Sequence, residues 1–228
     1  MTPRQLSALK VAVFLLALVP LGQLIFGLIN DSLGANPIET ITRKTGTWTF
    51  NFLLITLTVT PLRKIANWHW LIRLRRMLGL FAFFYACLHF TTYLWLDQFF
   101  DVAAIAKDIV KRPFITVGFA AFVLLIPLAV TSTNAAIKRM GGKRWQQLHY
   151  TIYAIGILAA VHYFWLVKPV ALPYPLAYAV ILATLLGWRA RERIRRFGPF
   201  PVNPKSANTP PELPKTAIIK FMPRPPRH

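Results

Sequence analysis

The chain has 228 residues, of which 55% are apolar, and a formal net charge of +20 from 27 Lys and Arg against 7 Asp and Glu. This apolar content exceeds the usage of about 45–50% in soluble domains and indicates a polytopic membrane protein. So strong a positive charge would suggest nucleic-acid binding in a soluble chain, but no basic domain with interleaved aromatic residues lies outside the apolar segments, so we expect no nucleic-acid partner.

Six apolar segments are long enough, or nearly long enough, to cross a bilayer as helices. A span needs about 20 mostly apolar residues, and the candidates in chain order are 9–29, 46–62, 77–96, 114–131, 146–166 and 171–188. The first is longer than the apolar region of a signal peptide, so we expect it to be retained. The second is short and rich in threonine, which makes it the weakest of the six. The predicted fold class is all-α, a polytopic membrane bundle of six transmembrane helices.

The basic residues predict the orientation of this bundle, because cytoplasmic loops collect Lys and Arg. With the N-terminus inside, 21 of the 27 basic residues fall on the cytoplasmic side, whereas five of the seven acidic residues fall outside. We therefore expect both termini in the cytoplasm. Residues 1–188 would form the membrane domain and 189–228 a basic, proline-rich cytoplasmic tail. The basic run at 187–197 would lie at the inner headgroups and favour anionic membrane lipids.

Three histidines lie within the predicted spans, where an ionisable side chain usually marks a functional site. His89 follows Arg76 by 13 residues, about 20 Å along a helix, and His162 follows Arg144 by 18 residues, about 27 Å. Both would lie in the outer half of the membrane, at depths that helix tilt can reconcile. Two histidines on facing helices suit the axial ligation of a haem iron, and bis-imidazole ligation suits electron transfer. We predict that His89 and His162 are the axial ligands of one haem.

The third histidine, His149, follows Arg144 by only 5 residues, roughly 8 Å from the inner surface. On one continuous helix it would point about 140° away from His162. A second haem there would need a partner about 13 residues before His89, where the sequence has two arginines. The role of His149 stays open between an alternative haem ligand, an electron relay or a flavin or quinone contact, and a histidine that only donates a hydrogen bond.

Several other kinds of site are not supported by the sequence. No GxGxxG or P-loop motif marks a nucleotide domain, and no CxxCH motif would attach a haem covalently. The single cysteine, Cys87, excludes an internal disulfide and a multi-cysteine metal site. His69 and His228 are interpreted as ordinary solvent or interface residues. Aromatic residues crowd the third and fifth spans, Tyr85 among them, and we expect most of them to face lipid or the membrane interface.

Four segments, taken in order, resemble the ferric-reductase-like transmembrane group over residues of about 40–190. They are TRKTGTWTFNFLLITLTVTPLRK, RRMLGLFAFFYACLHFTTYLWLDQ, KRPFITVGFAAFVLLIPLAVTS and KRWQQLHYTIYAIGILAAVHYFWLVK. The resemblance implies an inner-membrane subunit that binds haem b and transfers electrons without catalytic residues of its own. It implies as partner a periplasmic molybdenum enzyme of the MsrP type, which reduces methionine sulfoxide in oxidised proteins. By motif, the haem ligands are His89 and His162, and His149 is the third histidine of the group.

The resemblance further implies a bound FMN, with electrons drawn from the quinone pool or from a cytosolic flavin reductase. Nothing in the sequence locates the FMN. Four basic residues could pair with its phosphate, although the positive-inside rule explains them equally well: Arg75, Arg76, Lys143 and Arg144. Members of the group often carry a basic residue after the third histidine, where this chain has Tyr150.

On the outer side, four residues adjoin the ends of the two histidine helices and form the predicted docking surface for the partner: Asp97, Gln98, Asp101 and Lys168. Two other functions compete with electron transfer to a partner. One is a stand-alone ferric or quinone-linked reductase, against which the missing nucleotide domain argues. The other is a transporter in which histidines relay protons. It would lack the carboxylates that such relays usually employ, because no Asp or Glu lies in the central part of a predicted span.

Overall fold

A computed structural model describes residues 1–197, which form helices and no strand. The α-helices are α1 (Pro3–Ile29), α2 (Pro37–Ile65), α3 (Arg75–Thr92), α4 (Val102–Lys111), α5 (Pro113–Val130), α6 (Asn134–Met140), α7 (Gly142–His149), α8 (Thr151–Leu166) and α9 (Pro173–Phe197). Two 3₁₀ turns, η1 (His69–Arg73) and η3 (Pro169–Ala171), and one π-helical turn, η2 (Tyr93–Asp97), join them. The chain divides into two units after residue 188. From residue 198 onward the predicted tail, with His228, lies outside the described residues.

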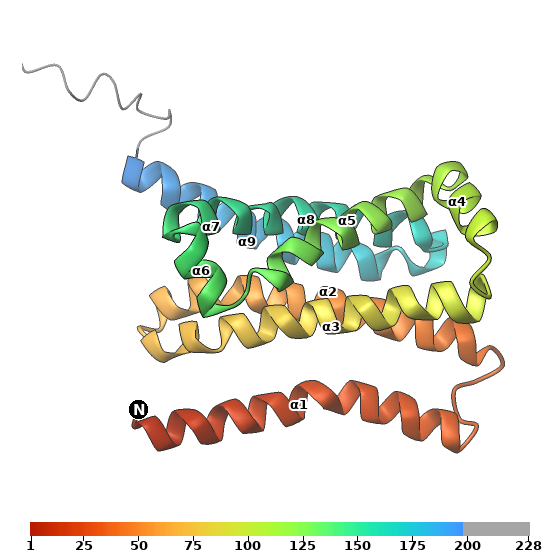
Figure 1. Ribbon diagram of the computed structural model, residues 1–228, viewed down its shortest axis with the longest axis horizontal. Coiled ribbons are helices and arrows are strands. Elements are labelled where there is room, and N and C mark those ends of the chain that lie inside the picture. Colours follow the sequence, from red (N-terminus) through yellow and green to blue (C-terminus); the bar gives the residue numbers. More distant parts are fainter. Residues whose placement is uncertain (198–228) are drawn as a thin grey trace, which may run out of the picture. The chain divides into compact units, whose positions relative to one another are not determined.

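Within the first unit, the long helices lie side by side along a common direction (Figure 1). α2 packs mainly against α3, and α5 packs mainly against α8. Three helical segments are long and apolar enough to cross a membrane, judged by length and composition: Pro3–Ile29, Arg75–Asp97 and Pro113–Val130. The predicted all-α class is confirmed for the described residues, whereas six spans and two cytoplasmic termini stay predictions.

Several helices begin where the sequence provides a capping residue. The Thr2 hydroxyl accepts from the backbone of Gln5, whose side chain accepts from the Thr2 backbone in return, so a capping box starts α1. Asn36 caps α2 and Asp101 caps α4 in the same way, through a side-chain oxygen. A proline stands in the first turn of α1, α2 and α5, where its missing N–H leaves no hydrogen bond unmade.

The second helix is longer than predicted. We expected a span at 46–62, but α2 covers 29 residues from Pro37. Its threonines fit a helix because their hydroxyls donate to backbone carbonyls one turn earlier; the hydroxyls of Thr45, Thr49 and Thr56, for example, donate to Ile41, Thr45 and Phe52. Arg43 and Lys44, which precede the predicted span, lie within this helix.

The fifth predicted span is not one helix. Residues 146–166 divide at Tyr150 between α7 and α8. The predicted angle of about 140° between His149 and His162 assumed one continuous helix, and that assumption was wrong. The segment before it, predicted as an inner loop, holds α6, and a left-handed Gly141, with φ of 77°, separates α6 from α7. The segment between α3 and α5, predicted as an outer loop, likewise holds a helix, α4. The sequence analysis predicted neither helix.

Tyr85 of α3 forms hydrogen bonds to the backbone of α1 beside the proline in that helix. Pro20 has no N–H and therefore disturbs the backbone hydrogen bonds around it. The hydroxyl of Tyr85 donates to the carbonyl of Ala17 at 2.8 Å and accepts from the N–H of Leu21 at 3.2 Å, so it bridges two groups beside the proline. Tyr85 is fully buried in the hydrophobic core, so it is not among the aromatic residues of this span that were expected to face lipid or the membrane interface.

We expect Tyr85→Phe to lower the free energy of unfolding by about 1–3 kcal/mol. The substitution keeps the ring but leaves a buried carbonyl and N–H without their partner. Thermal or denaturant unfolding of the detergent-solubilised protein measures the effect. Tyr150→Phe, which removes the hydroxyl from an exposed tyrosine, is the matched control. Equal stability of the two variants would contradict the bridging role.

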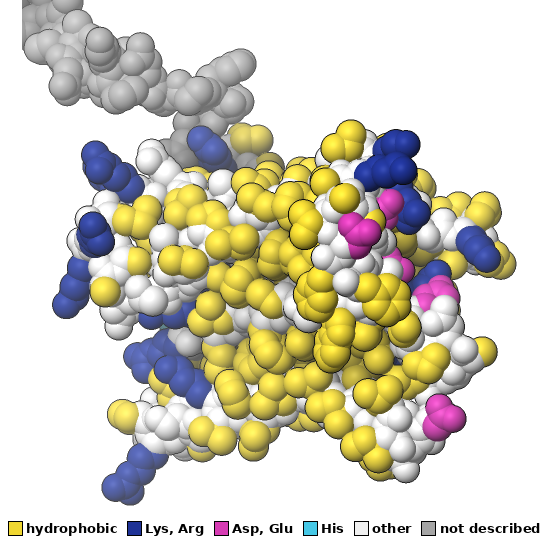
Figure 2. Space-filling model, turned by 45° about the vertical axis from the view of Figure 1, so that its right-hand side comes forward, with side chains coloured by type: hydrophobic (Ala, Val, Ile, Leu, Met, Phe, Trp, Pro, Cys, Tyr) yellow, Lys and Arg dark blue, Asp and Glu magenta, His cyan; other side chains and the backbone are white. Residues whose placement is uncertain are grey.

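The surface separates apolar from charged side chains. Figure 2 shows hydrophobic side chains across the middle of the molecule, most Lys and Arg at its left, and Asp and Glu toward its right. Large side chains on α1 are exposed, including Leu16 at 68% and Phe26 at 67%. Exposed apolar surface on this scale is typical of a lipid-facing bundle rather than of a soluble monomer.

Candidate functional site

The structure brings His89 and His162 together. His89 lies near the C-terminal end of α3 and His162 in the last turns of α8. Their ring centres are 6.1 Å apart and their ring planes are inclined by 73°. We predicted similar depths for the two histidines along the bundle, and in the structure their rings are neighbours.

Each of these imidazoles forms a hydrogen bond to the backbone of a neighbouring helix. Nδ1 of His89 is 2.9 Å from the carbonyl oxygen of Thr42 in α2, and Nδ1 of His162 is 2.7 Å from that of Phe114 in α5. A carbonyl oxygen only accepts, so Nδ1 carries the proton and donates it in both cases. Nε2 of each neutral ring is therefore left with its lone pair, which is the state that binds a metal.

The spacing of the pair fits a bis-imidazole haem. Two metal–nitrogen bonds of about 2 Å each, with roughly 1 Å from each nitrogen to its ring centre, separate the centres of two axial imidazoles by about 6 Å. The observed 6.1 Å matches this separation. No group of three or more His, Cys, Asp or Glu side chains suited to a metal ion occurs within residues 1–197. The 6.1 Å spacing of the two imidazoles suits the axial positions of an iron whose other four ligands come from a porphyrin.

His149 lies apart from the pair. Its ring stacks on Trp145 with ring centres 3.8 Å apart, and the indole N–H of Trp145 donates to the carbonyl of Thr131, just after α5 ends. His162 contacts Phe114 near the start of α5, about 25 Å from Thr131 along a helix. Nδ1 of His149 lies 3.0 Å from the carbonyl oxygen of Trp145, whereas its buried Nε2 has no hydrogen-bond partner among the described residues.

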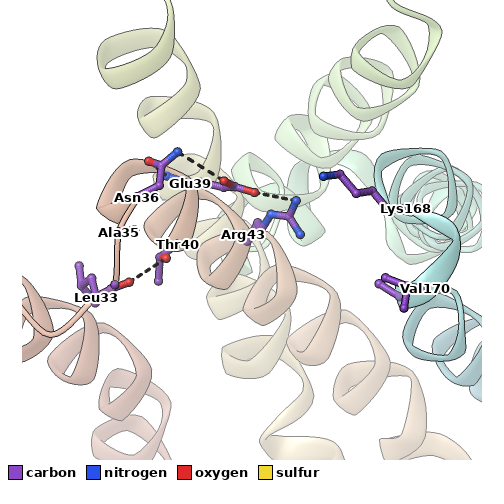
Figure 3. Close-up of a pocket in the computed structure, with 10 residues that line it drawn as sticks. Leu33, Ala35, Asn36, Glu39, Thr40, Arg43, Lys168 and Val170 are labelled. Carbon is purple, nitrogen blue, oxygen red and sulfur yellow. Dashed lines mark hydrogen bonds and ion pairs between the residues drawn. The ribbon is translucent and has the colours of Figure 1, made fainter.

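The predicted docking residues do not form one cluster through their recorded contacts. The amide of Gln98 donates to Asp97 and to Asp108 of α4, and Asp101 caps α4, so three of the four residues organise the turn between α3 and α4. Lys168 lines a separate cavity of about 520 Å³ at the start of α2 (Figure 3).

The cavity at the start of α2 contains a second basic residue, which sequence reasoning did not connect to Lys168. Arg43 lines it and pairs with Glu39 at 2.7 Å (Figure 3). The Arg43 backbone directly follows Thr42, whose carbonyl accepts the His89 proton. Sequence reasoning also missed the two accepting carbonyls, because a backbone acceptor has no residue type that marks it.

The basic residues considered for a flavin phosphate lie at the helix starts opposite this cavity. Arg75 and Arg76 begin α3, and Lys143 and Arg144 lie in the first turn of α7. The Arg76 guanidinium donates to the side chain of Asn134 at 2.8 Å, which ties α3 to α6. Arg76 therefore helps to hold α6 against α3, independent of any ligand. His69 is exposed in η1, as expected.

Comparison with known proteins places the chain in a family. The family model described as ferric reductase like transmembrane component matches residues 45–160. The protein-methionine-sulfoxide reductase heme-binding subunit MsrQ of Azospira oryzae is 62% identical over 96% of this chain and 92% of its own length. The MsrQ subunits of Herminiimonas arsenicoxydans and Rhodospirillum rubrum are 56% and 50% identical, over 84% and 82% of this chain and 91% and 89% of their own lengths.

No solved structure matches the chain. The similarity to the MsrQ subunits extends along most of both sequences. Together with the matched family model, it confirms the resemblance read from the four sequence segments. The chain belongs to the ferric reductase like transmembrane family and, within it, to the group of MsrQ subunits.

Proposed function

We propose that the chain is the haem-binding membrane subunit of a protein-methionine-sulfoxide reductase system and carries electrons toward its outer side. The observation that supports this most directly is the His89–His162 pair, with ring centres 6.1 Å apart and both Nδ1 protons donated to backbone carbonyls. The relatives named for haem binding support the same cofactor. We further propose that the pair binds one haem of b type, without a covalent attachment.

The residues of the site position the cofactor rather than react with substrate. Thr42 and Phe114 hold the two imidazoles through their carbonyls, so each ring presents a lone pair at Nε2. A haem bound by both histidines would supply one-electron oxidation and reduction at an iron with no open position. This ligation suits a relay, and we therefore propose a non-catalytic electron-transfer subunit.

The proposed membrane topology rests on the sequence pattern and on the helices of the structure. We propose residues 1–188 as a six-span domain in the bacterial inner membrane, with both termini and the tail from 189 in the cytoplasm. The helical hairpins α2–α3 and α5–α8 then carry the histidine pair in the outer half. The electron acceptor is proposed to be a periplasmic MsrP-type molybdenum enzyme that forms a heterodimer with this subunit and docks at the outer end near Lys168.

The electron source belongs to the opposite end of the bundle. We propose that electrons enter from the quinone pool or a cytosolic flavin reductase, with FMN as a bound carrier. His149 is a reasonable contact for such a carrier because its buried Nε2 has no partner among the described residues. Arg75 lies close enough to His149 to interact with it electrostatically. The two side chains come from α7 and α3, near the proposed inner face.

A reduced-minus-oxidised visible spectrum of the detergent-purified protein tests the haem proposal. We expect the bands of a low-spin b-type haem, released by acid acetone because it is not covalently bound, and about one haem per chain by pyridine haemochrome assay. A spectrum without a b-type signal, from protein expressed with sufficient haem supply, would instead support a histidine-relay transporter. A content of two haems per chain would assign an iron to His149 as well.

A further inference from the structure

The two histidines of the pair are held by the same local arrangement, repeated on two helix hairpins. In α2–α3, His89 donates to the carbonyl of Thr42, and in α5–α8, His162 donates to the carbonyl of Phe114. Four residues after each accepting carbonyl stands a glycine, Gly46 in α2 and Gly118 in α5. In each hairpin, one helix carries the histidine, and the other carries the carbonyl that accepts its proton and a glycine four residues later.

The four-residue spacing has a geometric reason. In an α-helix the carbonyl of one residue points at the N–H of the residue four positions later. A side chain at that later position therefore flanks the carbonyl and obstructs a second donor that approaches from outside the helix. Glycine leaves the approach open, although it weakens a helix interior relative to alanine.

The clearances show how closely the rings approach these glycines. A Cβ atom added at Gly118 would lie 2.7 Å from Nδ1 and 2.8 Å from Cε1 of His162. One added at Gly46 would lie 3.0 Å from Cε1 and 3.1 Å from Nδ1 of His89. Favourable contacts between carbon atoms are about 3.5–4.0 Å. An alanine at either position would push the ring away from the carbonyl that it bonds.

Other glycines in the described residues do not have this neighbour. A Cβ at Gly22 or Gly187 would meet nothing within 4 Å. One at Gly156 would lie 3.1 Å from a methyl group of Leu182, so it would be crowded to the same degree as at Gly46 but by an aliphatic side chain. Close approach to an imidazole is therefore specific to Gly46 and Gly118 among the glycines that the structure describes.

We propose that Gly46 and Gly118 are positioning residues for the haem ligands. Each provides a notch in which an imidazole lies against the neighbouring helix and donates Nδ1–H to its carbonyl, which fixes the ring orientation and directs Nε2 to the iron. This inference rests on the proposed haem site. A hydrogen bond at Nδ1 also makes the imidazole a stronger donor, which favours ferric over ferrous iron and lowers the midpoint potential.

The experiment compares Gly118→Ala and Gly46→Ala with Gly156→Ala and Gly187→Ala in the full-length, haem-loaded protein. Haem per chain is measured by pyridine haemochrome assay, the midpoint potential by redox titration, and folding by size-exclusion chromatography and thermal unfolding. We expect Gly118→Ala to weaken haem retention by about 10–100-fold, the range for loss of a group that supports a metal ligand. Gly46→Ala has more clearance, so it should retain more haem, with a midpoint potential shifted upward.

The controls separate ligand positioning from general crowding. Gly156→Ala should lower thermal stability without a change in midpoint potential, and Gly187→Ala should alter neither. If Gly118→Ala does not fold, the midpoint potential of Gly46→Ala tests the proposal, because the proposal expects this potential to shift upward. Haem content and potential equal to those of the parent in the two histidine-facing variants would overturn the glycine role while leaving the haem site intact. A parent protein without b-type haem would overturn the proposed function and this inference with it.

Discussion

Replacing either His89 or His162 with alanine is expected to abolish haem retention, whereas His149→Ala should retain at least part of the haem. The first two histidines lie with ring centres 6.1 Å apart, and each Nδ1 proton is donated to a carbonyl. A haem iron held by this proposed pair would keep a single protein ligand if either histidine were removed. His149 lies at the other end of α5, stacked on Trp145. Haem per purified chain, with the visible spectrum, measures the difference.

His69→Ala is the matched control, because His69 is exposed in η1 and should leave haem content unchanged. Each variant is first checked by size-exclusion chromatography, so that loss of haem is not confused with loss of fold. Haem bound at the parental level by either His89→Ala or His162→Ala would refute the ligand pair. Complete loss in His149→Ala would show that the inner histidine supports the site in a way that its position does not explain.

The partnership of the two histidines was predictable from the sequence because helix rise converts sequence position into depth. The distance of His89 from Arg76 and of His162 from Arg144 predicted similar depths for the two residues, and their rings lie 6.1 Å apart in the structure. The same argument excluded His149 from the pair. In the structure His149 stacks on Trp145, whose indole bonds Thr131 at the end of α5 opposite to the residue that His162 contacts.

The means by which the rings are held could not be predicted in this way. The acceptors are backbone carbonyls, which every residue has, so Thr42 and Phe114 were indistinguishable from their neighbours. Gly46 and Gly118 can be distinguished from other glycines only when the helix that faces each of them is known. Helix pairing is a tertiary property. Hydropathy predicts that segments cross a membrane but not which of them touch.

The predicted helix boundaries were wrong for a more local reason. A search for apolar runs undervalues helices whose polar groups are satisfied internally, and α2 is such a helix because its threonine hydroxyls donate to its own carbonyls. α4 was missed because it is short and amphipathic, although Asp101 supplies a recognisable N-cap. Apolar length alone therefore underestimated the helix content at both ends of the bundle.

Dithionite-reduced protein is expected to be reoxidised by methionine sulfoxide only when the periplasmic molybdenum reductase is present. An iron with two histidine ligands has no open position at which a sulfoxide could bind, so the proposed subunit must pass its electron to a separate catalytic centre. Anaerobic stopped-flow spectroscopy of the reduced haem band measures the rate with substrate alone, with partner alone and with both. Equal rates with and without the partner would favour a stand-alone reductase.

Charge reversal at Lys168, near the proposed outer end, tests the proposed docking site in the same measurement. Lys168 lines the cavity beside Arg43, which follows the residue whose carbonyl holds His89, so a partner docked there would approach the histidine pair. We expect Lys168→Glu to slow partner-dependent reoxidation by up to about tenfold at low ionic strength and less at high salt, because a rim charge acts mainly on association. Lys138→Glu, in α6 at the opposite end, is the matched control and should leave the rate unchanged. An equal effect of both variants would show that net charge, rather than docking at this cavity, governs the encounter.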